Sequence, residues 1–300
     1  EELQELLVSL TAQTYTKPFE VIVVDDGSST PLKTVAESFA NKLDIKYFYK
    51  QNSGPGASRN YGMDKASGNY FLIVDSDCII PENYLTIVSN HLDTNFTDAY
   101  GGPDTAHPSF TVLQKAINYS MTSFLTTGGL RTGRSTKRFQ LRSFNMGLSR
   151  KAYEITGGFS DMRIGEDIDL TFRLWDNELS SQCIADAFVY HKRRSSVTQF
   201  YDQTYAFGKA RPGLNRKYPG SARLTFWFPS LFLGGLVLAS IAAVFGYYHL
   251  AMLYTFYLLL IAIDATVRNK SIAVGALSVW TTLTQFVGYG VGFVKGWLLG

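Results

Sequence analysis

Cysteine is scarce in this chain of 300 residues. The two cysteines, Cys78 and Cys183, lie far apart and match neither a metal-ligand spacing nor a redox motif. We therefore expect mostly structural thiols that stay reduced. The first residues, Glu1 to Glu5, are acidic and lack the basic segment that begins a secretory signal peptide, so no signal peptide is expected.

The chain also lacks a large excess of charge of either sign. Its formal net charge of +3 gives no reason to expect a nucleic-acid partner. No Gly-x-Gly-x-x-Gly dinucleotide fingerprint occurs, because Arg59 stands where the third glycine would follow Gly54 and Gly56. This absence disfavours a nicotinamide oxidoreductase.

Charged residues are missing from 224–263 and from 271–294. Since a membrane-spanning helix needs about 20 mostly apolar residues, we expect two to three transmembrane helices within 224–300. The alternative is a buried helical hairpin in a soluble protein. The predicted spans lie near 225–246, 249–267 and 272–294.

Lys and Arg flank these spans unevenly, which predicts an orientation. They occur at 211–223 and at 268–270 but not near residue 247, so the positive-inside rule places the soluble part in the cytoplasm. The third span also fits a re-entrant or interfacial segment, because it holds several glycines and ends at Lys295. Residues 196–223 are expected to be an amphipathic linker whose helix lies on the membrane or packs on the soluble domain.

Before residue 196, strand and helix patterns alternate along the chain. Apolar runs at 19–24 and 70–74 are typical of strands buried on both faces. This alternation predicts an α/β domain over 1–195, with a Rossmann-like, mostly parallel sheet flanked by helices. Ligands of such sheets bind beyond the carboxyl ends of the strands. Further strands are expected at 44–49 and 187–190, and helices at 2–12, 31–42, 57–66, 110–125 and 167–177.

Asp75-Ser76-Asp77 follows the strand at 70–74. Because side chains alternate along a strand, the two carboxylates are expected to point the same way and converge. Hard divalent cations take carboxylate and phosphate oxygens as ligands, so the pair predicts a metal site that neutralises a nucleotide diphosphate. An ordinary acidic turn is the alternative.

Asp25 and Asp26 end the strand at 19–24. Turn and helix-cap chemistry accounts for Asp25. Asp26 is suited to accept hydrogen bonds from a base or from ribose hydroxyls, with turn chemistry as an equal alternative. Arg59, at the start of a predicted helix, is suited to hold a base or a phosphate.

Glu166 and Asp167 open the helix at 167–177, where acidic residues also compensate the helix dipole. The functional hypothesis is that Asp167 removes the proton of an acceptor hydroxyl as general base. Glu166 is a candidate contact for the acceptor or the diphosphate. Asp169 is expected on the surface of the helix.

His191 follows the strand at 187–190 and precedes Arg193 and Arg194. A lone histidine is more often structural, but this combination could meet a metal ion and a diphosphate. His191 is therefore a candidate metal ligand, and the two arginines are candidate diphosphate or acceptor contacts. A basic loop at 131–138 is a candidate contact for an acceptor phosphate.

In their order and spacing, these motifs resemble family 2 glycosyltransferases with the GT-A fold. The resemblance covers about residues 3–195, and several ordered motifs are more specific than any single one. C-terminal hydrophobic helices are common in the bacterial members of this family. The matching segments are 20–29 (EVIVVDDGSS), 54–62 (GPGASRNYG), 66–77 (ASGNYFLIVDSD), 157–159 (GGF) and 166–170 (EDIDL).

The resemblance implies a role for each main candidate. Asp26 would contact the donor base, Arg59 the nucleotide, and Asp75 the donor sugar or ribose. Asp77 would ligate Mg²⁺ or Mn²⁺. Asp167 would be the catalytic base of a transfer that inverts the anomeric centre.

Two departures from the family pattern qualify this expectation. The family's first strand, whose Pro-x-Tyr-Asn-like end helps to bind the base, is absent, which predicts weak donor binding by these residues alone. The Gln-x-x-Arg-Trp motif of polymerising synthases is also absent. Its absence favours the transfer of a single sugar.

The leading hypothesis is a metal-dependent transferase whose catalytic domain is cytoplasmic and whose helices lie in a bacterial inner membrane. It would move a sugar from a nucleotide-diphosphate sugar to a lipid-linked or saccharide acceptor in glycan or polysaccharide biosynthesis. A catalytically silent nucleotide-sugar-binding or scaffold subunit is the alternative. A third hypothesis is lipid-linked sugar synthesis, with polyprenyl phosphate itself as the acceptor.

Overall fold

The computed structural model describes residues 1–129 and 138–299. Most of the predicted basic loop at 131–138 therefore lies outside the described residues. The chain divides into two compact units, of which the first contains residues 1–105 and 138–191. The second contains residues 106–129 and 192–299. The predicted domain limits at 195 and 223 stay a prediction.

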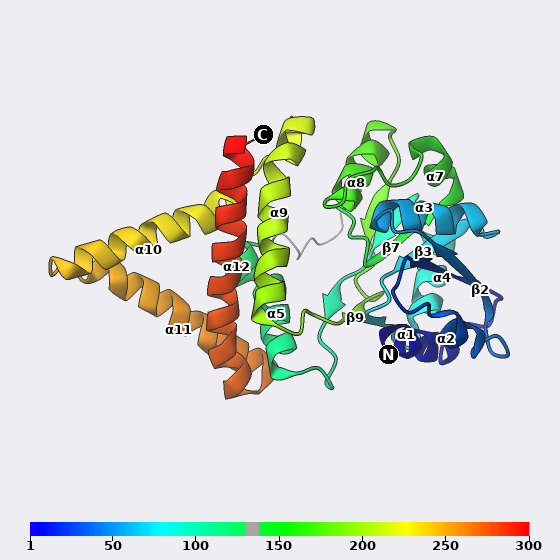
Figure 1. Cartoon of the computed structure of the whole chain (residues 1–300), viewed down its shortest axis with the longest axis horizontal. Coiled ribbons are helices and arrows are strands. Elements are labelled where there is room, and N and C mark those ends of the chain that lie inside the picture. The colour runs from blue at the N-terminus through cyan, green and yellow to red at the C-terminus, as the bar shows by residue number, and fades with distance from the viewer. Residues whose placement is uncertain (130–137, 300) are drawn as a thin grey trace. The chain divides into compact units, whose positions relative to one another are not determined.

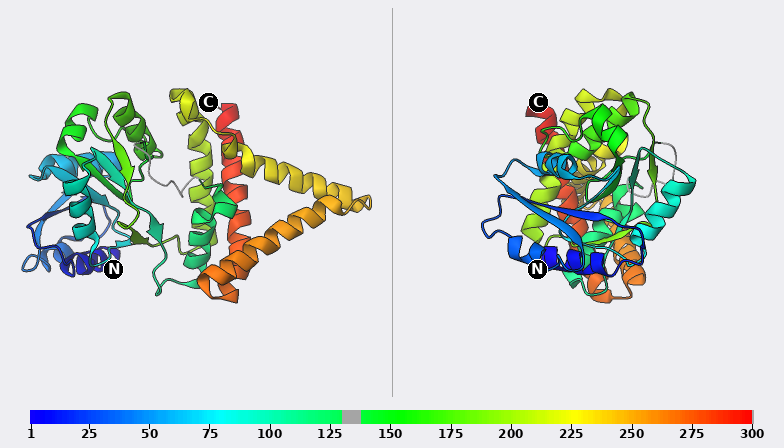
Figure 2. Two further views of the ribbon diagram at one scale, coloured as in Figure 1. Left: turned by 180° about the vertical axis from the view of Figure 1, so that it is seen from behind. Right: turned by 90° about the vertical axis from the view of Figure 1, so that its right-hand side faces the viewer.

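The second unit is helical. Figures 1 and 2 show α10 and α11 as a hairpin that leads away from α12, while α12 runs beside α9. Within the described residues, three helices are long and apolar enough to cross a membrane: Leu224–Val244, α11 and α12. The elements are α5 (Val112–Thr122), α6 (Phe124–Thr127), α9 (Val197–Lys217), the 3₁₀ turns η1 (Pro219–Ser221) and η2 (Leu224–Trp227), α10 (Phe228–Val244), α11 (His249–Asn269) and α12 (Ile272–Leu299).

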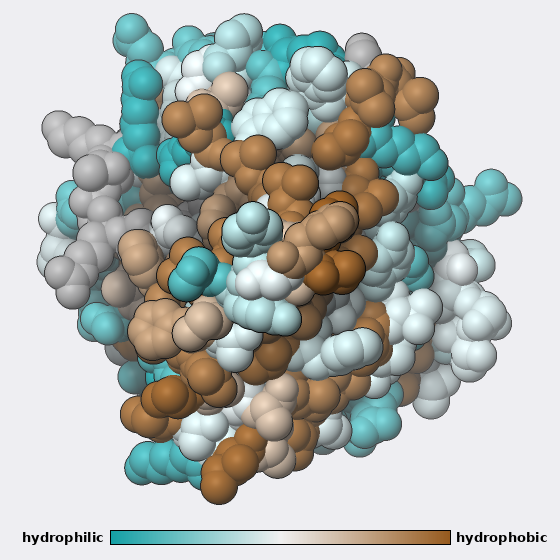
Figure 3. Space-filling model, turned by 90° about the vertical axis from the view of Figure 1, so that its left-hand side faces the viewer, coloured by the Kyte–Doolittle hydropathy of each residue, from teal (hydrophilic) through white to brown (hydrophobic). Residues whose placement is uncertain are grey.

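The hairpin of α10 and α11 exposes large apolar side chains. Leu238 and Val244 of α10 are 63% and 84% exposed, and Leu253 and Phe256 of α11 are 65% and 60% exposed. Figure 3 views the molecule from the hairpin side, where hydrophobic residues cover much of the face. A continuous apolar surface of this kind is typical of contact with lipid or with another protein.

The strands in the described part of the first unit form three sheets. The first pairs β1 (Glu20–Asp26) with β2 (Asp44–Lys50). The second has the order β3 (Tyr70–Val74), β7 (Asn145–Ser149), β5 (Ala99–Gly101), β8 (Ser181–Cys183). The third has the order β4 (Cys78–Ile79), β9 (Val189–His191), β6 (Asp104–Thr105).

Of the helices that flank these sheets, α1, α3 and α8 lie at the positions that the sequence predicted, whereas α7 was not predicted. The predicted helix at 31–42 is shorter, because α2 ends at Glu37 and single turns follow, such as the bond from the Phe39 N–H to the Ala36 oxygen at 3.1 Å. The helices of the first unit are α1 (Glu2–Thr11), α2 (Lys33–Glu37), α3 (Pro55–Lys65), α4 (Tyr84–Thr94), α7 (Arg150–Thr156) and α8 (Glu166–Asp176).

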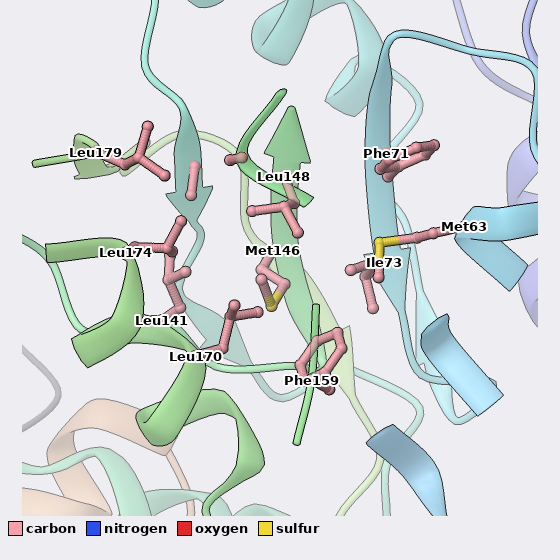
Figure 4. Close-up of a cluster of buried hydrophobic side chains, with 12 residues drawn as sticks. Met63, Phe71, Ile73, Leu141, Met146, Leu148, Phe159, Leu170, Leu174 and Leu179 are labelled. Atoms are coloured by element: carbon pink, nitrogen blue, oxygen red, sulfur yellow. The ribbon is translucent and has the colours of Figure 1, made fainter. Parts of the chain in front are cut away.

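A large core of the first unit contains residues of β3, β7, α3 and α8 (Figure 4). Phe71 and Ile73 enter it from β3 because alternate residues of a strand share a face. Leu72 between them is 37% exposed, so the prediction that β3 is buried on both faces is wrong at this residue. Other members are Met63, Met146, Leu148, Phe159, Leu170 and Leu174.

The predicted α/β class is confirmed, but the sheets are mixed rather than mostly parallel. In the described part of the chain, β1–β2, β5–β8 and β6–β9 are parallel, whereas β3–β7, β5–β7 and β4–β9 are antiparallel. Between β6 and β7 the chain passes through α5 and α6 of the second unit. Among the described residues between these two strands, the helices belong to the second unit, and β7 pairs antiparallel with both β3 and β5.

Glu20, at the start of β1, ties this strand to the loop before β3. Its Oε1 accepts hydrogen bonds from the N–H and the hydroxyl of Ser67 at 2.5 and 2.8 Å and from the N–H of Gly68 at 3.0 Å. Lys46 of β2 forms an ion pair with Oε2 at 2.9 Å. Burial acts to raise the pKa of Glu20, but Lys46, Ser67 and Gly68 together lower it to about 2.

This lowered pKa predicts an acid-sensitive contribution to stability. The contribution is complete above the ordinary pKa of 4.5 and is lost as the pH falls towards about 2, because the unfolded chain binds the proton first. Glu20→Gln should lower the melting temperature at pH 7 and make its fall below pH 4.5 shallower. Thermal unfolding followed by circular dichroism tests this, with the exposed Glu154→Gln as control. Parallel pH profiles for wild type and Glu20→Gln would contradict the assignment.

Candidate active site

Asp25 is buried near the end of β1 and holds the turn that follows. Its carboxylate accepts hydrogen bonds from the N–H groups of Ser28 and Leu32 at 2.9 and 3.2 Å, and from the Tyr47 hydroxyl at 2.7 Å. Burial acts to raise the pKa of Asp25, but these hydrogen bonds lower it. Asp25 therefore has the turn chemistry that its sequence context indicates.

Asp26, the last residue of β1, forms an ion pair with Lys50 at the end of β2. Its two oxygens also accept hydrogen bonds from the N–H groups of Ser53 and Gly54, both at 2.9 Å. Burial acts to raise the pKa of Asp26, but Lys50 and these N–H groups lower it. Sequence analysis missed Lys50, although residues that end neighbouring parallel strands lie side by side, and the register does pair Asp26 with Lys50.

Asp75 and Asp77 lie in the turn that joins β3 to β4. Because the strand has already ended, its alternation does not continue through them, and their carboxylates have different partners. Asp75 faces Arg59, and Asp77 faces His191. The convergence of the two carboxylates on one cation stays a prediction.

Asp77 and His191 meet because β4 and β9 pair antiparallel, with Cys78 opposite His191. His191 Nε2 lies 3.3 Å from Asp77 Oδ1, and its ring stacks on Phe144 with centroids 4.7 Å apart. An Asp77 oxygen, a His191 nitrogen and the sulfur of the buried Cys78 all lie within 4.8 Å of one another. Carboxylate and imidazole groups bind divalent cations, so this donor set fits the metal that the sequence predicted.

Arg59 on α3 links the end of β3 to the start of α8. Its guanidinium donates to Asp75 Oδ1 at 2.7 Å and to Glu166 Oε1 at 2.8 Å, and lies 5.4 Å from the ring centroid of Phe159. Burial acts to lower the pKa of Arg59, but Asp75 and Glu166 raise it. Gly56, about one turn before Arg59, lets α3 lie close to the backbone of Ser160. A Cβ at this position would be 2.9 Å from the Ser160 backbone oxygen.

Glu166 and Asp167 differ in access. The Glu166 side chain is 8% exposed, and its Oε1 accepts hydrogen bonds from Arg59 and from the Ser143 hydroxyl at 3.3 Å. Burial and then the charge of Asp167 raise the pKa of Glu166, against a lowering by Arg59. Asp167 is half-buried and accepts N–H hydrogen bonds from Ser143 and Ile168 at 3.3 and 2.8 Å. Asp167 is thus the more accessible of the two carboxylates.

Asp169 is not on the helix surface, so that prediction is wrong. Its side chain is fully buried and accepts a hydrogen bond from Arg173 Nε at 2.9 Å. Arg173 also donates to the backbone oxygens of Thr156 and Gly158 at 2.5 and 2.6 Å. The buried charge of Asp169 is tolerated because Arg173 forms an ion pair with it. Arg173 also holds the Gly157-Gly158 turn through its backbone hydrogen bonds.

Arg193 and Arg194 belong to the second unit. Arg193 is buried and donates to Asn118 Oδ1 at 3.3 and 3.1 Å. Arg194 is exposed. Contacts of Arg193, Arg194 and Glu166 with a diphosphate or an acceptor stay predictions. The first unit holds the remaining predicted site residues, Glu166 included: Asp26, Arg59, Asp75, Asp77, Glu166, Asp167 and His191.

The sequence model described as "Glycosyl transferase family 2" matches residues 1–156, more than half of the chain. The chain belongs to this family. The match to glycosyl transferase family 2 includes Asp26, Arg59, Asp75 and Asp77, and it ends before α8 and β9.

Curated relatives in this family match over a limited region. An uncharacterized glycosyltransferase of Rickettsia conorii is 41% identical over 105 residues, which are 33% of this chain and 17% of that protein. The poly(ribitol-phosphate) beta-N-acetylglucosaminyltransferase TarS of Staphylococcus aureus is 36% identical over 99 residues, 32% of this chain and 17% of TarS. The matched part thus spans about a sixth of the length of these two relatives.

Solved structures resemble this chain over nearly its whole length. The mannosyltransferase PcManGT of Pyrobaculum calidifontis, in complex with GDP-Man and Mn²⁺, has a TM-score of 0.63 at 16% identity, covering 94% of this chain and 83% of that one. TarS 1–349 in complex with UDP-GlcNAc has a TM-score of 0.50 at 19% identity, covering 97% and 86%. These likenesses concern the fold, and the predicted GT-A fold is confirmed.

The Arg59 ion pairs predict a stability effect that depends on pH. Arg59→Met should lower the free energy of unfolding at pH 7 by about 3 kcal/mol, because it leaves Asp75 and Glu166 without a cation. The difference in unfolding free energy between wild type and variant should become smaller towards pH 5. In the folded variant Glu166 binds a proton more readily than in the unfolded chain, so lowering the pH stabilises the folded variant.

Urea unfolding of both proteins at the two pH values measures this. Lys17→Met is the matched control, because Lys17 forms an ion pair with Asp93 in which both side chains are more than 60% exposed. This control should change the unfolding free energy by less than about 1 kcal/mol at either pH. An Arg59→Met deficit no larger than that of the control would refute a stabilising role of the bridge.

Proposed function

We propose that this chain transfers a sugar from a nucleotide-diphosphate sugar to an acceptor hydroxyl, with inversion at the anomeric carbon. The observation that carries the proposal is the arrangement around Arg59, which holds Asp75 and Glu166 together, while Asp167 follows Glu166 on α8. Membership of glycosyl transferase family 2 and the nucleotide-sugar complexes of PcManGT and TarS support it.

The donor would bind at the ends of β1 and β3. Asp26 keeps an ionised carboxylate that already accepts hydrogen bonds from Lys50 and backbone N–H groups, so a base N–H or a ribose hydroxyl can replace Lys50 there. Arg59 would contact the nucleotide, and Asp75, held by Arg59, would bind the donor sugar or ribose. Arg193, Arg194 and Glu166 would contact the diphosphate or the acceptor.

Asp77 and His191 would hold the divalent cation, Mg²⁺ or Mn²⁺. The bound cation would neutralise the negative charge that develops on the nucleotide diphosphate as it leaves. Phe144 fixes the plane of the His191 ring by stacking, and the β4–β9 pairing sets its distance from Asp77. PcManGT was solved with Mn²⁺, which supports a cation of this size and charge.

Asp167 would act as the general base. Its carboxylate would take the proton of the acceptor hydroxyl while that oxygen forms a bond to the anomeric carbon. The bond from the anomeric carbon to the diphosphate oxygen breaks on the opposite face, and its electron pair leaves with the nucleotide diphosphate. The N–H groups of Ser143 and Ile168 hold the carboxylate in place.

The acceptor would be lipid-linked or a saccharide, used in glycan or polysaccharide biosynthesis. We assign the catalytic domain to 1–195, a linker to 196–223 and the membrane part to 224–300. The apolar helices would place the protein in a bacterial inner membrane, beside its lipids, with the catalytic domain in the cytoplasm. Three helices with the length and composition of spans support this location.

The catalytic roles predict separable effects. Asp167→Asn should reduce sugar transfer by about 100- to 10,000-fold while donor binding persists, because only the proton acceptor is lost. Asp77→Ala should lose the response to added Mn²⁺, and chelation of divalent cations should inactivate the wild type. Release of nucleoside diphosphate from a panel of nucleotide sugars, with membrane extract as acceptor source, measures each effect.

Asp44→Asn is the control for these variants, since Asp44 is exposed at the start of β2. Undiminished transfer by Asp77→Ala or by Asp167→Asn would remove that residue from the mechanism. Calorimetry that detects donor binding by the wild type without turnover across a broad acceptor panel would instead support the silent binding or scaffold subunit.

A further inference from the structure

α12 packs along much of its length on two other helices of the second unit. Near its middle, Thr281 Oγ1 lies 2.7 Å from the Ser120 hydroxyl of α5. Near its end, Gly296 brings its backbone against α9, because a Cβ there would lie 2.2 Å from the backbone oxygen of Lys209. From 281 to 296 a helix rises about 22 Å, which is most of the roughly 30 Å thickness of a bilayer's hydrocarbon core.

α9 does not have the composition of a membrane-spanning helix. Asp202, Lys209 and Arg216 all lie on it and are exposed. Charged side chains in the hydrocarbon core are rare and costly, and they face the interior of a bundle or a watery cavity. If α12 crossed the bilayer, the close backbone packing would carry this charged helix across with it.

The ends of the helices give an independent argument. In a chain that crosses a membrane three times, the first span begins on one side and the third span ends on the other. Here Trp227, at the start of the first candidate, and Trp297, at the end of α12, have ring centroids only 6.0 Å apart. The Ser230 hydroxyl also donates to the backbone oxygen of Gly290 at 3.0 Å. Therefore the three candidates cannot all be spans.

The α10–α11 hairpin has the features of the part that crosses. Its helices contain 17 and 21 residues, or about 26 and 32 Å, which matches the hydrocarbon core. Arg223 and Arg268 lie at its base, whereas its tip at 245–249 has no Lys or Arg. At the base, Asp264 of α11 accepts a hydrogen bond from Tyr119 of α5 at 2.7 Å.

We propose that only the α10–α11 hairpin crosses the bilayer, and that α12 lies with α9 along the cytoplasmic membrane surface. The partner of the outward face of α12 is the bilayer itself, because this face exposes apolar side chains and α12 packs on both helices of the apolar hairpin. Tryptophan prefers this depth. The apolar residues of the face are between 37% and 59% exposed: Trp280, Val287, Val291, Val294 and Trp297.

Lys295 fits the same arrangement. Its ammonium lies 5.9 Å from the ring centroid of Tyr205 on α9, so it stays beside the charged helix. With three spans it would instead reach the far side of the membrane, where the positive-inside rule disfavours it. The inference rests on the membrane location given under the proposed function, but not on any catalytic role.

Cysteine labelling of the full chain in intact cells tests the sidedness. In a Cys78→Ser, Cys183→Ser background, Tyr247→Cys marks the hairpin tip, Leu299→Cys the end of α12, and Lys17→Cys the catalytic unit. A membrane-impermeant maleimide should label Tyr247→Cys in intact cells, and the other two only after permeabilisation. Labelling of Leu299→Cys in intact cells, or protection of Tyr247→Cys there, would overturn the proposal.

A depth measurement decides the matter if Leu299→Cys reacts under neither condition. Spin labels at Trp280→Cys and Val291→Cys lie about 16 Å apart along α12. Collision with oxygen and with a nickel chelate should place both at one depth near the headgroups, and a label at Leu238→Cys of α10 much deeper. A depth difference close to 16 Å would show a spanning α12 and refute the proposal. Recovery of the protein in the soluble fraction would instead refute the membrane location itself.

Discussion

The candidate active site depends on one guanidinium, that of Arg59, whose side chain is 14% exposed. Arg59 donates hydrogen bonds to both Asp75 and Glu166. Its positive charge therefore lies between these two negatively charged side chains. Each acid comes from a different element, the turn after β3 and the first turn of α8, while Arg59 itself comes from α3. Three segments far apart in the sequence are therefore positioned by one planar group with a fixed donor geometry.

The Arg59 bridge also explains why Glu166 and Asp167, which are adjacent on α8, differ in accessibility. Glu166 is directed inward to Arg59 and Ser143, whereas Asp167 is held by backbone N–H groups and stays half-buried. The Gly157-Gly158 turn supports the same region, because Arg173 holds it through the buried Asp169. Structural ion pairs thus surround the one carboxylate that remains accessible on this helix turn.

Much of the fold and of the candidate site could be predicted from the sequence, since both follow from local patterns. β3 and the acidic turn after it were found because an apolar run followed by Asp, Ser and Asp is a local signal. Lys50 and Ser143 were missed because their roles depend on which strand or loop lies beside them. Asp169 was misplaced because a buried acid is recognisable only when its partner Arg173 is known to face inward.

The membrane part shows the same limit at a larger scale. Composition identifies apolar helices, but it cannot report that α12 packs on a charged helix or that Trp227 meets Trp297. The strand directions of the first unit were likewise mispredicted in part, because the chain leaves that unit between β6 and β7. A segment of one unit that lies in the sequence between two segments of the other breaks the rule that neighbours in sequence are neighbours in space.

The Lys50–Asp26 ion pair has a consequence for turnover. Lys50 is an internal competitor for the carboxylate that we assign to the donor base, and it is tethered at the adjacent strand end. Donor affinity is reduced by the fraction of molecules in which this competitor occupies the site. The same competition would oppose rebinding of the spent nucleotide, because Lys50 would pair with Asp26 again once the base has left. Under the proposed function, the strand pairing of β1 and β2 would therefore lower donor affinity and oppose rebinding of the spent nucleotide, whose release is a step that often limits the rate of an enzyme.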